Sequence, residues 1–212
     1  MPFAPFLIPV MAGVVAAATG WQLKASAAGP NTGGSTFTLG PINTTGADLI
    51  VVSSAGSFGS TLPIDSVSNT WHVILQGNVN IWYAWNALTS SAHTFTVNND
   101  YYSAGAVLAY SGSLKTSAAL DQSSTANANQ PGSITPTTSG QLIVAVASLQ
   151  TANPPYTINP GFTVEALEDY ISGVNFGVVA GDLIQGAAAA VNPTFLPSAS
   201  MQTTAIASFK HA

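Results

Sequence analysis

Charged side chains are scarce in this sequence. They make up 5% of the 212 residues, with eight Asp and Glu, three Lys and no Arg. A typical soluble domain carries about 25% charged residues. Most catalytic strategies need ionisable groups, and phosphate recognition favours the guanidinium fork of Arg. The composition therefore argues against a nucleic-acid partner and offers few of the groups that an enzyme uses.

Cysteine is absent, which excludes a disulfide framework and a thiolate metal site. The three histidines, His72, His93 and His211, do not have the spacing of a metal-ligand set. The sequence also contains no nucleophile elbow, no zinc-protease helix motif and no phosphate-binding glycine loop. We therefore expect no cofactor, no metal ion and no catalytic residues, and we expect that the protein is not an enzyme.

One group of carboxylates lies close together in the sequence, at Glu165, Glu168 and Asp169. A hydrolase uses such a pair as acid and base. On a strand, however, Glu165 and Glu168 project to opposite faces, which separates them. We interpret the group as a solvated edge or loop that discourages unwanted strand pairing.

The stretch from Phe3 to Trp21 is uncharged and largely apolar. A secretory signal fits the small residues that follow it, although no Lys or Arg precedes the apolar run. A membrane helix is less favoured because Pro5 and Pro9 interrupt the run. We favour a third reading, in which residues 1–20 form an apolar arm that packs on a neighbouring subunit. The contact residues predicted in this arm are Phe3, Phe6, Leu7 and Ile8.

Beyond Trp21, runs rich in Val, Ile, Thr and aromatic residues alternate with clusters of Gly, Asn, Ser and Pro. This pattern predicts strands and turns almost throughout, with no long helix. The predicted strands fall into two β units of similar order, residues 21–113 and residues 133–212. The polar stretch 114–132 is interpreted as the linker between them.

Five short motifs of the first unit recur in the second, at a period of roughly 95 residues. Each unit alone is too small to be stable as a single layer with one apolar face. The repeat therefore predicts an all-β fold, a β-sandwich or jelly-roll-like domain in which both units share one core. Two separate small sandwiches are the alternative. The matched pairs are Leu49–Val51 with Leu142–Val144, Asn69–Val73 with Gly161–Val164, Val79–Ile81 with Val174–Phe176, Phe95 with Phe195, and Ala106–Tyr110 with Ala205–Phe209.

The most aromatic segment, Asn80–Leu88, is predicted to be a strand covered on both faces. Alternation places Tyr83 and Trp85 on one face and Trp82 and Asn86 on the other. We predict that Trp85 belongs to the core. Trp82 is predicted to contact a partner chain or a sugar ring, because Asn86 on its face indicates a partly polar environment.

Three segments carry a resemblance to a known module: Asp65–Trp71 (DSVSNTW), Val79–Ala84 (VNIWYA) and His93–Val97 (HTFTV). Together they resemble an uncharacterised β-sandwich module found in phage structural proteins and bacterial surface proteins. The resemblance covers most of residues 46–112 and implies a surface or virion building block without catalytic residues. From the residues themselves, Asp65 and Asn69 are expected to hydrogen-bond nearby backbone in a turn.

These observations favour a non-enzymatic structural subunit of a virion or other extracellular assembly. Because interface cores are depleted of charge, a subunit surrounded by copies of itself or by other subunits tolerates such a composition. We expect an outer-surface protein, of the decoration or fibre kind, at the virion surface or in the extracellular space. The alternative is a carbohydrate-binding or adhesive module that contacts a surface glycan. Membrane contact through residues 1–20 is possible in either case but is not favoured.

Overall fold

The computed structural model describes residues 20–30, 34–56, 61–75, 77–98, 102–113, 116 and 119–212. Within these residues the chain forms fifteen strands and one short 3-10 turn, Ser198–Ser200. The prediction of an all-β protein is therefore confirmed. The predicted arm of residues 1–20, with Phe3, Phe6, Leu7 and Ile8, lies outside the described residues except for Gly20. Among the described residues, no helix is long and apolar enough to cross a membrane.

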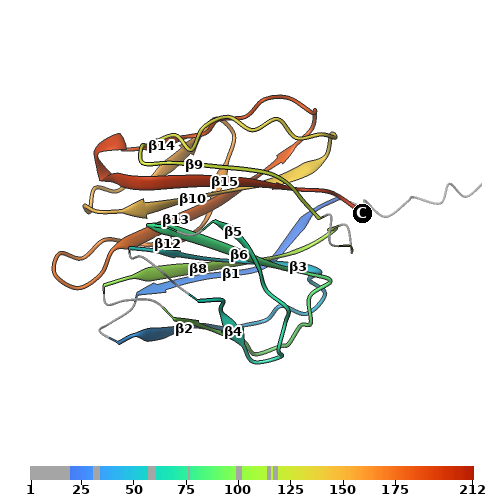
Figure 1. Cartoon of the computed structure of the whole chain (residues 1–212), viewed down its shortest axis with the longest axis horizontal. Helices are drawn as coiled ribbons and strands as arrows, with labels where there is room; N and C mark the ends of the chain where they lie inside the picture. The colour runs from blue at the N-terminus through green and yellow to red at the C-terminus, as the bar shows by residue number, and fades with distance from the viewer. Residues whose placement is uncertain are drawn as a thin grey trace, which may run out of the picture.

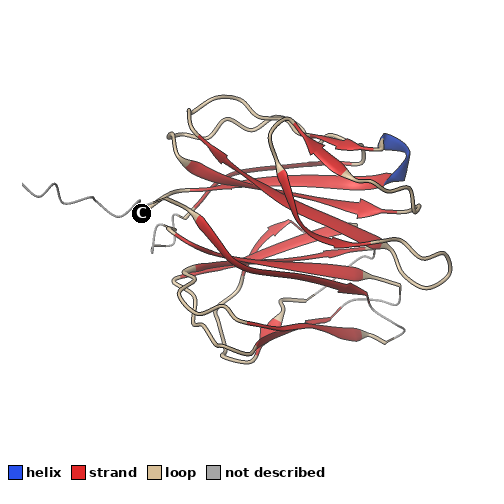
Figure 2. Cartoon of the chain, turned by 180° about the vertical axis from the view of Figure 1, so that it is seen from behind, coloured by secondary structure: helices blue, strands red, loops and turns tan. Residues whose placement is uncertain are grey.

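Two five-stranded antiparallel sheets form the centre of the molecule, one above the other in Figures 1 and 2. The first sheet has the order β1 (Gln22–Pro30), β8 (Ala104–Ser111), β3 (Leu49–Ala55), β6 (Val79–Trp85) and β5 (His72–Leu75). The second has the order β12 (Thr163–Glu168), β13 (Gly177–Gln185), β10 (Gln141–Leu149), β15 (Met201–Phe209) and β9 (Leu120–Ala126).

Each large sheet is covered on its outer face by a smaller sheet, so the molecule has four layers (Figure 1). The first small sheet lies below the first large sheet in this view, and the second lies above the second. A buried cluster fills the space between each small sheet and its large neighbour. The first small sheet consists of β2 (Thr36–Ile42), β7 (His93–Asn98) and β4 (Ile64–Asp65), and the second of β11 (Thr157–Asn159) and β14 (Thr194–Leu196).

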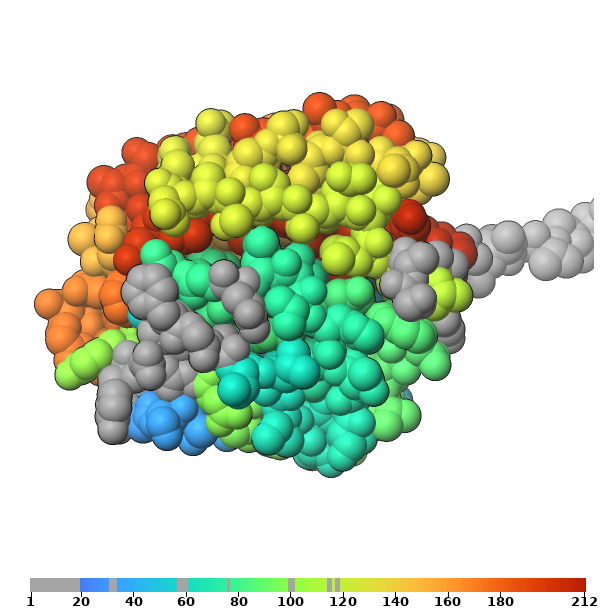
Figure 3. Space-filling model, in the orientation of Figure 1, coloured from blue at the N-terminus to red at the C-terminus, as the bar shows by residue number. Residues whose placement is uncertain are grey.

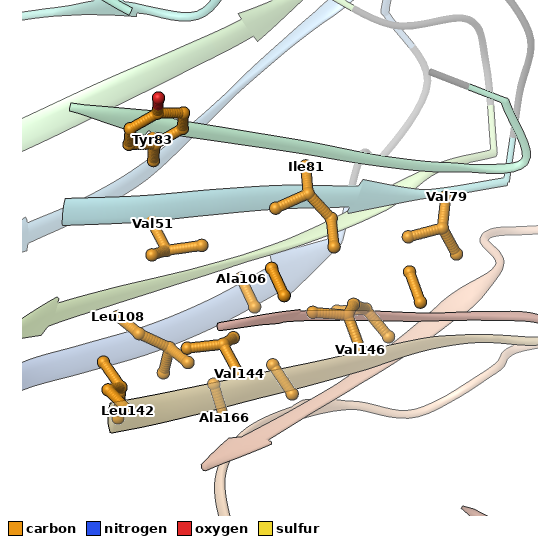
Figure 4. Close-up of a cluster of buried hydrophobic side chains, with 14 of the residues drawn as sticks. Val51, Val79, Ile81, Tyr83, Ala106, Leu108, Leu142, Val144, Val146 and Ala166 are labelled. Carbon is orange, nitrogen blue, oxygen red and sulfur yellow. The ribbon is translucent and has the colours of Figure 1, made fainter. Parts of the chain in front are cut away.

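The central core lies between the two large sheets, where side chains of β3, β6 and β8 face those of β10 and β13 (Figure 4). All seven residues of β3 are buried. Leu49 and Val51 point into this central cluster, whereas Ile50 and Val52 point outward to the small sheet. The continuous apolar run in β3 is thus explained by burial on both of its faces.

The two large sheets share a strand order when each is followed along the chain. Leu49 lies opposite Tyr110 on β8, and Leu142 lies opposite Phe209 on β15. One of the five predicted motif pairs does not have equivalent positions. Leu49 faces Trp85 on β6, and Leu142 faces Ile184 on β13. Val79 lies six positions before Trp85 and Val178 lies six positions before Ile184, so these two valines are in equivalent positions. The predicted partner, Val174, lies in the loop before β13, so that match is wrong.

The predicted linker, residues 114–132, also needs correction. Seven of its residues form β9, which pairs with β15 at the edge of the second large sheet. The Ser- and Thr-rich sequence of β9 suits an edge strand, because several of its side chains meet solvent. The predicted second unit begins with residues 133–135, which form only an isolated bridge between Ile134 and Val191.

Candidate functional site

Asp65 lies at the centre of the DSVSNTW motif and folds the loop between β4 and β5 around its carboxylate. The carboxylate accepts hydrogen bonds from the backbone N–H of Val67 at 2.8 Å and of Asn69 at 3.1 Å. It also accepts one from the indole Nε1 of Trp71 at 2.9 Å. The prediction that Asp65 hydrogen-bonds its own turn is confirmed.

His93, the first residue of β7, joins this loop to the small sheet. Its Nε2 lies 3.3 Å from Asp65 Oδ1, outside good hydrogen-bond geometry. Its Nδ1 lies 2.9 Å from the hydroxyl of Thr44, and its ring stacks on Phe95 with centroids 4.1 Å apart. We call Thr44, Asp65, Trp71 and His93 the Asp65–His93 network.

The charges of this network follow from its environment. Burial of Asp65 raises its pKa, but the backbone N–H groups of Val67 and Asn69, together with His93, offset this and hold the pKa below its usual value. Burial lowers the pKa of His93 more than the neighbouring Asp65 raises it. Asp65 is therefore ionised and His93 neutral at neutral pH.

Thr44, His93 and Asp65 follow the order of a hydroxyl, an imidazole and a carboxylate in a catalytic triad. The side chains of His93 and Asp65 are completely buried, and Thr44 has no exposed surface. The Thr44 hydroxyl also contacts the backbone of Ser90. Because a substrate cannot reach this hydroxyl in the folded chain, the network acts as an internal link between the β4–β5 loop and β7.

The exposed part of the same motif borders a cleft of about 300 Å³. The residues that line this cleft come from the β4–β5 loop, from β5, and from the end of β6 and the loop that follows it. The chain between β4 and β6, in teal and green, forms part of the surface in Figure 3. We call the site the Trp85 cleft; its lining residues are Ser68, Asn69, Thr70, His72, Trp85, Asn86 and Leu88.

Two aromatic rings form one wall of the Trp85 cleft. Nε1 of Trp85 donates a hydrogen bond of 3.1 Å to Nε2 of His72. The two rings lie 21° from parallel with centroids 6.0 Å apart. The hydrogen bond joins atoms at the edges of the two rings, and the ring planes are nearly parallel. The rings therefore lie edge to edge. Together they form a flat surface, the aromatic platform.

The rim of the cleft is held by one asparagine. The Asn69 side chain donates to the carbonyl of Leu88 at 3.0 Å and accepts from the backbone N–H of Leu88 at 2.7 Å. These two bonds fix the loop after β6 against the loop before β5. Ser68 and Asn86, on the two loops, have φ angles of 64° and 48°, in the left-handed region that non-glycine residues seldom adopt.

The structure overturns the role predicted for Trp82, whereas Trp85 packs against the central cluster as expected. Trp82 is completely buried between the first large sheet and its small sheet. It therefore has no surface with which to meet a partner or sugar, and its prediction as a contact residue is wrong. Trp85 is only half-buried, because it is the last residue of β6. The sequence does indicate that Trp85 lies at the end of a strand, because Asn86 and further turn residues follow it directly.

Glu165 and Glu168 lie on β12, an edge strand of the second large sheet, so their interpretation as part of an edge is confirmed. Glu165 and Glu168 are both half-buried rather than fully solvated. Asp169 accepts a hydrogen bond of 2.6 Å from the Tyr156 hydroxyl, which anchors a loop. Burial, together with Asp169, raises the pKa of Glu168. Glu165 lies near a carboxylate that the sequence did not indicate, Asp182 on the adjacent strand β13.

Asp182 predicts a measurable pH dependence of stability. Burial, reinforced by Glu165, raises its pKa to about 6, and the nearby Tyr110 hydroxyl offsets this only in part. A carboxyl with a raised folded pKa binds more protons in the folded than in the unfolded state. Asp182 therefore stabilises the folded state in its protonated form. This stabilisation is complete at pH values below the unfolded pKa of 3.8, and it is lost as the pH rises through the folded pKa of about 6.

We expect Asp182→Asn to be more stable than the unsubstituted chain at pH 8, by about 1–2 kcal/mol after allowance for the partial exposure of this side chain. Near pH 4 the two proteins should have the same stability. Urea unfolding of both proteins across this pH range measures the difference between their free energies of unfolding. Other titrating groups, such as His93, contribute equally to both proteins, so their contributions cancel in this difference. A difference that does not vary with pH would contradict the assignment.

Within the part of the chain that the structure describes, no group of three or more His, Cys, Asp or Glu residues could hold a metal ion. No family model, curated protein or solved structure matches this chain.

Proposed function

We propose that this chain is a non-enzymatic structural subunit of a virion or other extracellular assembly, exposed on the outer surface of that assembly. The observation that carries the proposal is the number of large apolar side chains that the folded chain leaves in contact with solvent. Among the described residues, ten such side chains are between 39% and 63% exposed: Leu62, Ile64, Val73, Leu88, Tyr102, Leu167, Ile171, Val174, Ile184 and Leu196.

The chain has only eleven charged residues to accompany these exposed apolar side chains. An isolated soluble protein usually keeps such patches small and surrounds them with charge. Tyr102, Ile171 and Val174 gather around a hollow of about 170 Å³ that Tyr170 and Phe176 also line. Apolar surface with little charge is typical of the core of a subunit interface. The surface of this chain therefore suits burial against copies of itself or other subunits.

We further propose that the two β units are copies of one ancestral unit that share a central sandwich core. Three features support this interpretation: the common strand order, the register of Leu49 and Leu142, and the position of an edge irregularity. In the first sheet the pairing of β5 with β6 shifts between Val73 and Leu75. In the second sheet the pairing of β12 with β13 shifts between Val164 and Ala166. Recurrence of a bulge at an equivalent position is expected after duplication, because bulges persist within families.

Deletion of residues 1–20 tests the proposed role of the apolar arm in assembly. We expect the truncated chain to keep the circular dichroism of a β protein, because the two large sheets are built from later residues. We expect its mass by light scattering to fall to that of a monomer, while the full chain has a multiple of that mass. Loss of the β signal would place the arm in the core instead. An unchanged oligomer mass would remove the arm from the assembly contacts.

A further inference from the structure

We propose that the Trp85 cleft binds a neutral glycan, with a sugar ring on the aromatic platform of His72 and Trp85. This function goes beyond the structural role proposed above and does not depend on it. The proposal rests on the shape of the platform, on the uncharged polar rim, and on the way both are fixed in place.

Both rings of the aromatic platform line the cleft. The indole N–H of Trp85 is already used by His72 Nε2. Because Nε2 accepts this bond, the proton of the His72 ring is assigned to Nδ1. Part of Trp85 packs against the central cluster, and the rest borders the cleft. A pyranose ring has one face of C–H groups, which pack on a flat aromatic surface as other apolar groups do.

The rest of the cleft offers uncharged polar groups. Ser68, Thr70 and Asn86 are exposed and contribute two hydroxyls and one amide, which both donate and accept hydrogen bonds. Sugar hydroxyls have the same dual character. Leu88 adds an apolar wall and is 55% exposed. A volume of about 300 Å³ is at the small end of ligand sites and suits one or two sugar rings.

The electrostatics of the site favour a neutral ligand over an acidic one. None of the seven lining residues is Lys or Arg. The ionised carboxylate of Asp65 lies directly behind the rim, where it accepts a hydrogen bond from the backbone of Asn69. An acidic sugar would therefore meet a negative charge without a compensating cation.

The cleft is also organised before any ligand binds. Asn69 ties the two rim loops together through Leu88, and the Asp65 carboxylate fixes the backbone of Asn69. Fixing the loops in advance reduces the entropy that binding would otherwise cost. Asn69 is thus a positioning residue, whereas Trp85 is expected to contact the sugar.

Intrinsic fluorescence gives a direct test on the full-length protein. Trp21, Trp71 and Trp82 are at most 7% exposed, so acrylamide should quench mainly Trp85, the remaining one of the four tryptophans. The probes are neutral trisaccharides of glucose, galactose, mannose and N-acetylglucosamine, and a sialylated trisaccharide, each at up to millimolar concentration. We expect at least one neutral trisaccharide to protect Trp85 saturably, and the sialylated one to protect it less.

Variants identify the site, with binding followed by calorimetry because the substitutions change the fluorescence. Trp85→Ala should weaken binding about tenfold or more, and Trp85→Phe should weaken it less. Leu196→Ala, on β14 of the outer small sheet of the second unit, is a matched control that should bind as the unsubstituted protein does. Circular dichroism checks that each variant is folded.

Three results would overturn the proposal: no saturable binding of any neutral trisaccharide, equal binding by folded Trp85→Ala, or preference for the sialylated probe. If Trp85→Ala lowers the oligomer mass in light scattering while none of the sugars binds, the cleft is a contact between subunits and not a glycan site. That last result would leave the structural role intact, so failure of the two proposals can be told apart.

Discussion

Replacement of Trp82 by alanine should lower the free energy of unfolding by about 3–5 kcal/mol, the range for loss of a large buried aromatic side chain. Trp82 has no exposed surface and lies in the cluster between the first large sheet and its small sheet. Its removal leaves a cavity that β6, fixed by β3 and β5 on either side, cannot close. Chemical denaturation followed by circular dichroism measures the loss.

Two matched variants sharpen this result. Trp82→Phe should cost much less, because it keeps most of the ring and removes an indole N–H that has no hydrogen-bond partner. Trp85→Ala should also cost less, about 1 kcal/mol, because that side chain is only partly buried. If Trp85→Ala proves more destabilising than Trp82→Ala, the burial that we assign to the two residues is reversed.

Replacement of Asp65 by alanine should lower the free energy of unfolding by about 3–5 kcal/mol, because several hydrogen bonds to one buried carboxylate are lost together. The carboxylate accepts hydrogen bonds from Val67, Asn69 and Trp71 and contacts His93. Its removal leaves the buried indole N–H of Trp71 without an acceptor and releases the β4–β5 loop. Thermal and urea unfolding both measure this loss.

Asp65→Asn is the matched variant, because its amide oxygen retains one acceptor in nearly the same volume. We expect it to lose less stability than Asp65→Ala. A surface role for Asp65 would instead leave the stability of both variants unchanged. Because Asp65 fixes Asn69 at the rim of the Trp85 cleft, Asp65→Ala should also weaken any sugar binding that the cleft shows.

The sequence was sufficient to predict the β class, because alternation and turn residues are local properties. It also predicted that β6 is covered on both faces, and Tyr83 and Trp82 do point into different buried clusters. The error on Trp82 has a physical cause. Asn86 was used to mark the face of Trp82, but its φ of 48° places it beyond the strand, where alternation no longer holds.

The candidate site could be predicted only in part. The turn around Asp65 is local, since its acceptors and donors lie within six residues of each other in the chain. The contact of Asp65 with His93 joins residues 28 positions apart, and no spacing rule indicates it. Similarly, Asn69 reaches Leu88 across 19 positions. Such contacts follow from the packing of the small sheet on the large one, which the repeat pattern did not predict.

The mass of the intact chain in solution is the most direct test of its proposed role as an assembly subunit. Size-exclusion chromatography with light scattering over a range of concentrations measures it without any substitution. Our account predicts a discrete multiple of the 21.5 kDa chain mass, because the exposed apolar side chains would be covered by neighbouring subunits. A stable 21.5 kDa monomer at every concentration, in the presence of intact residues 1–20, would contradict it.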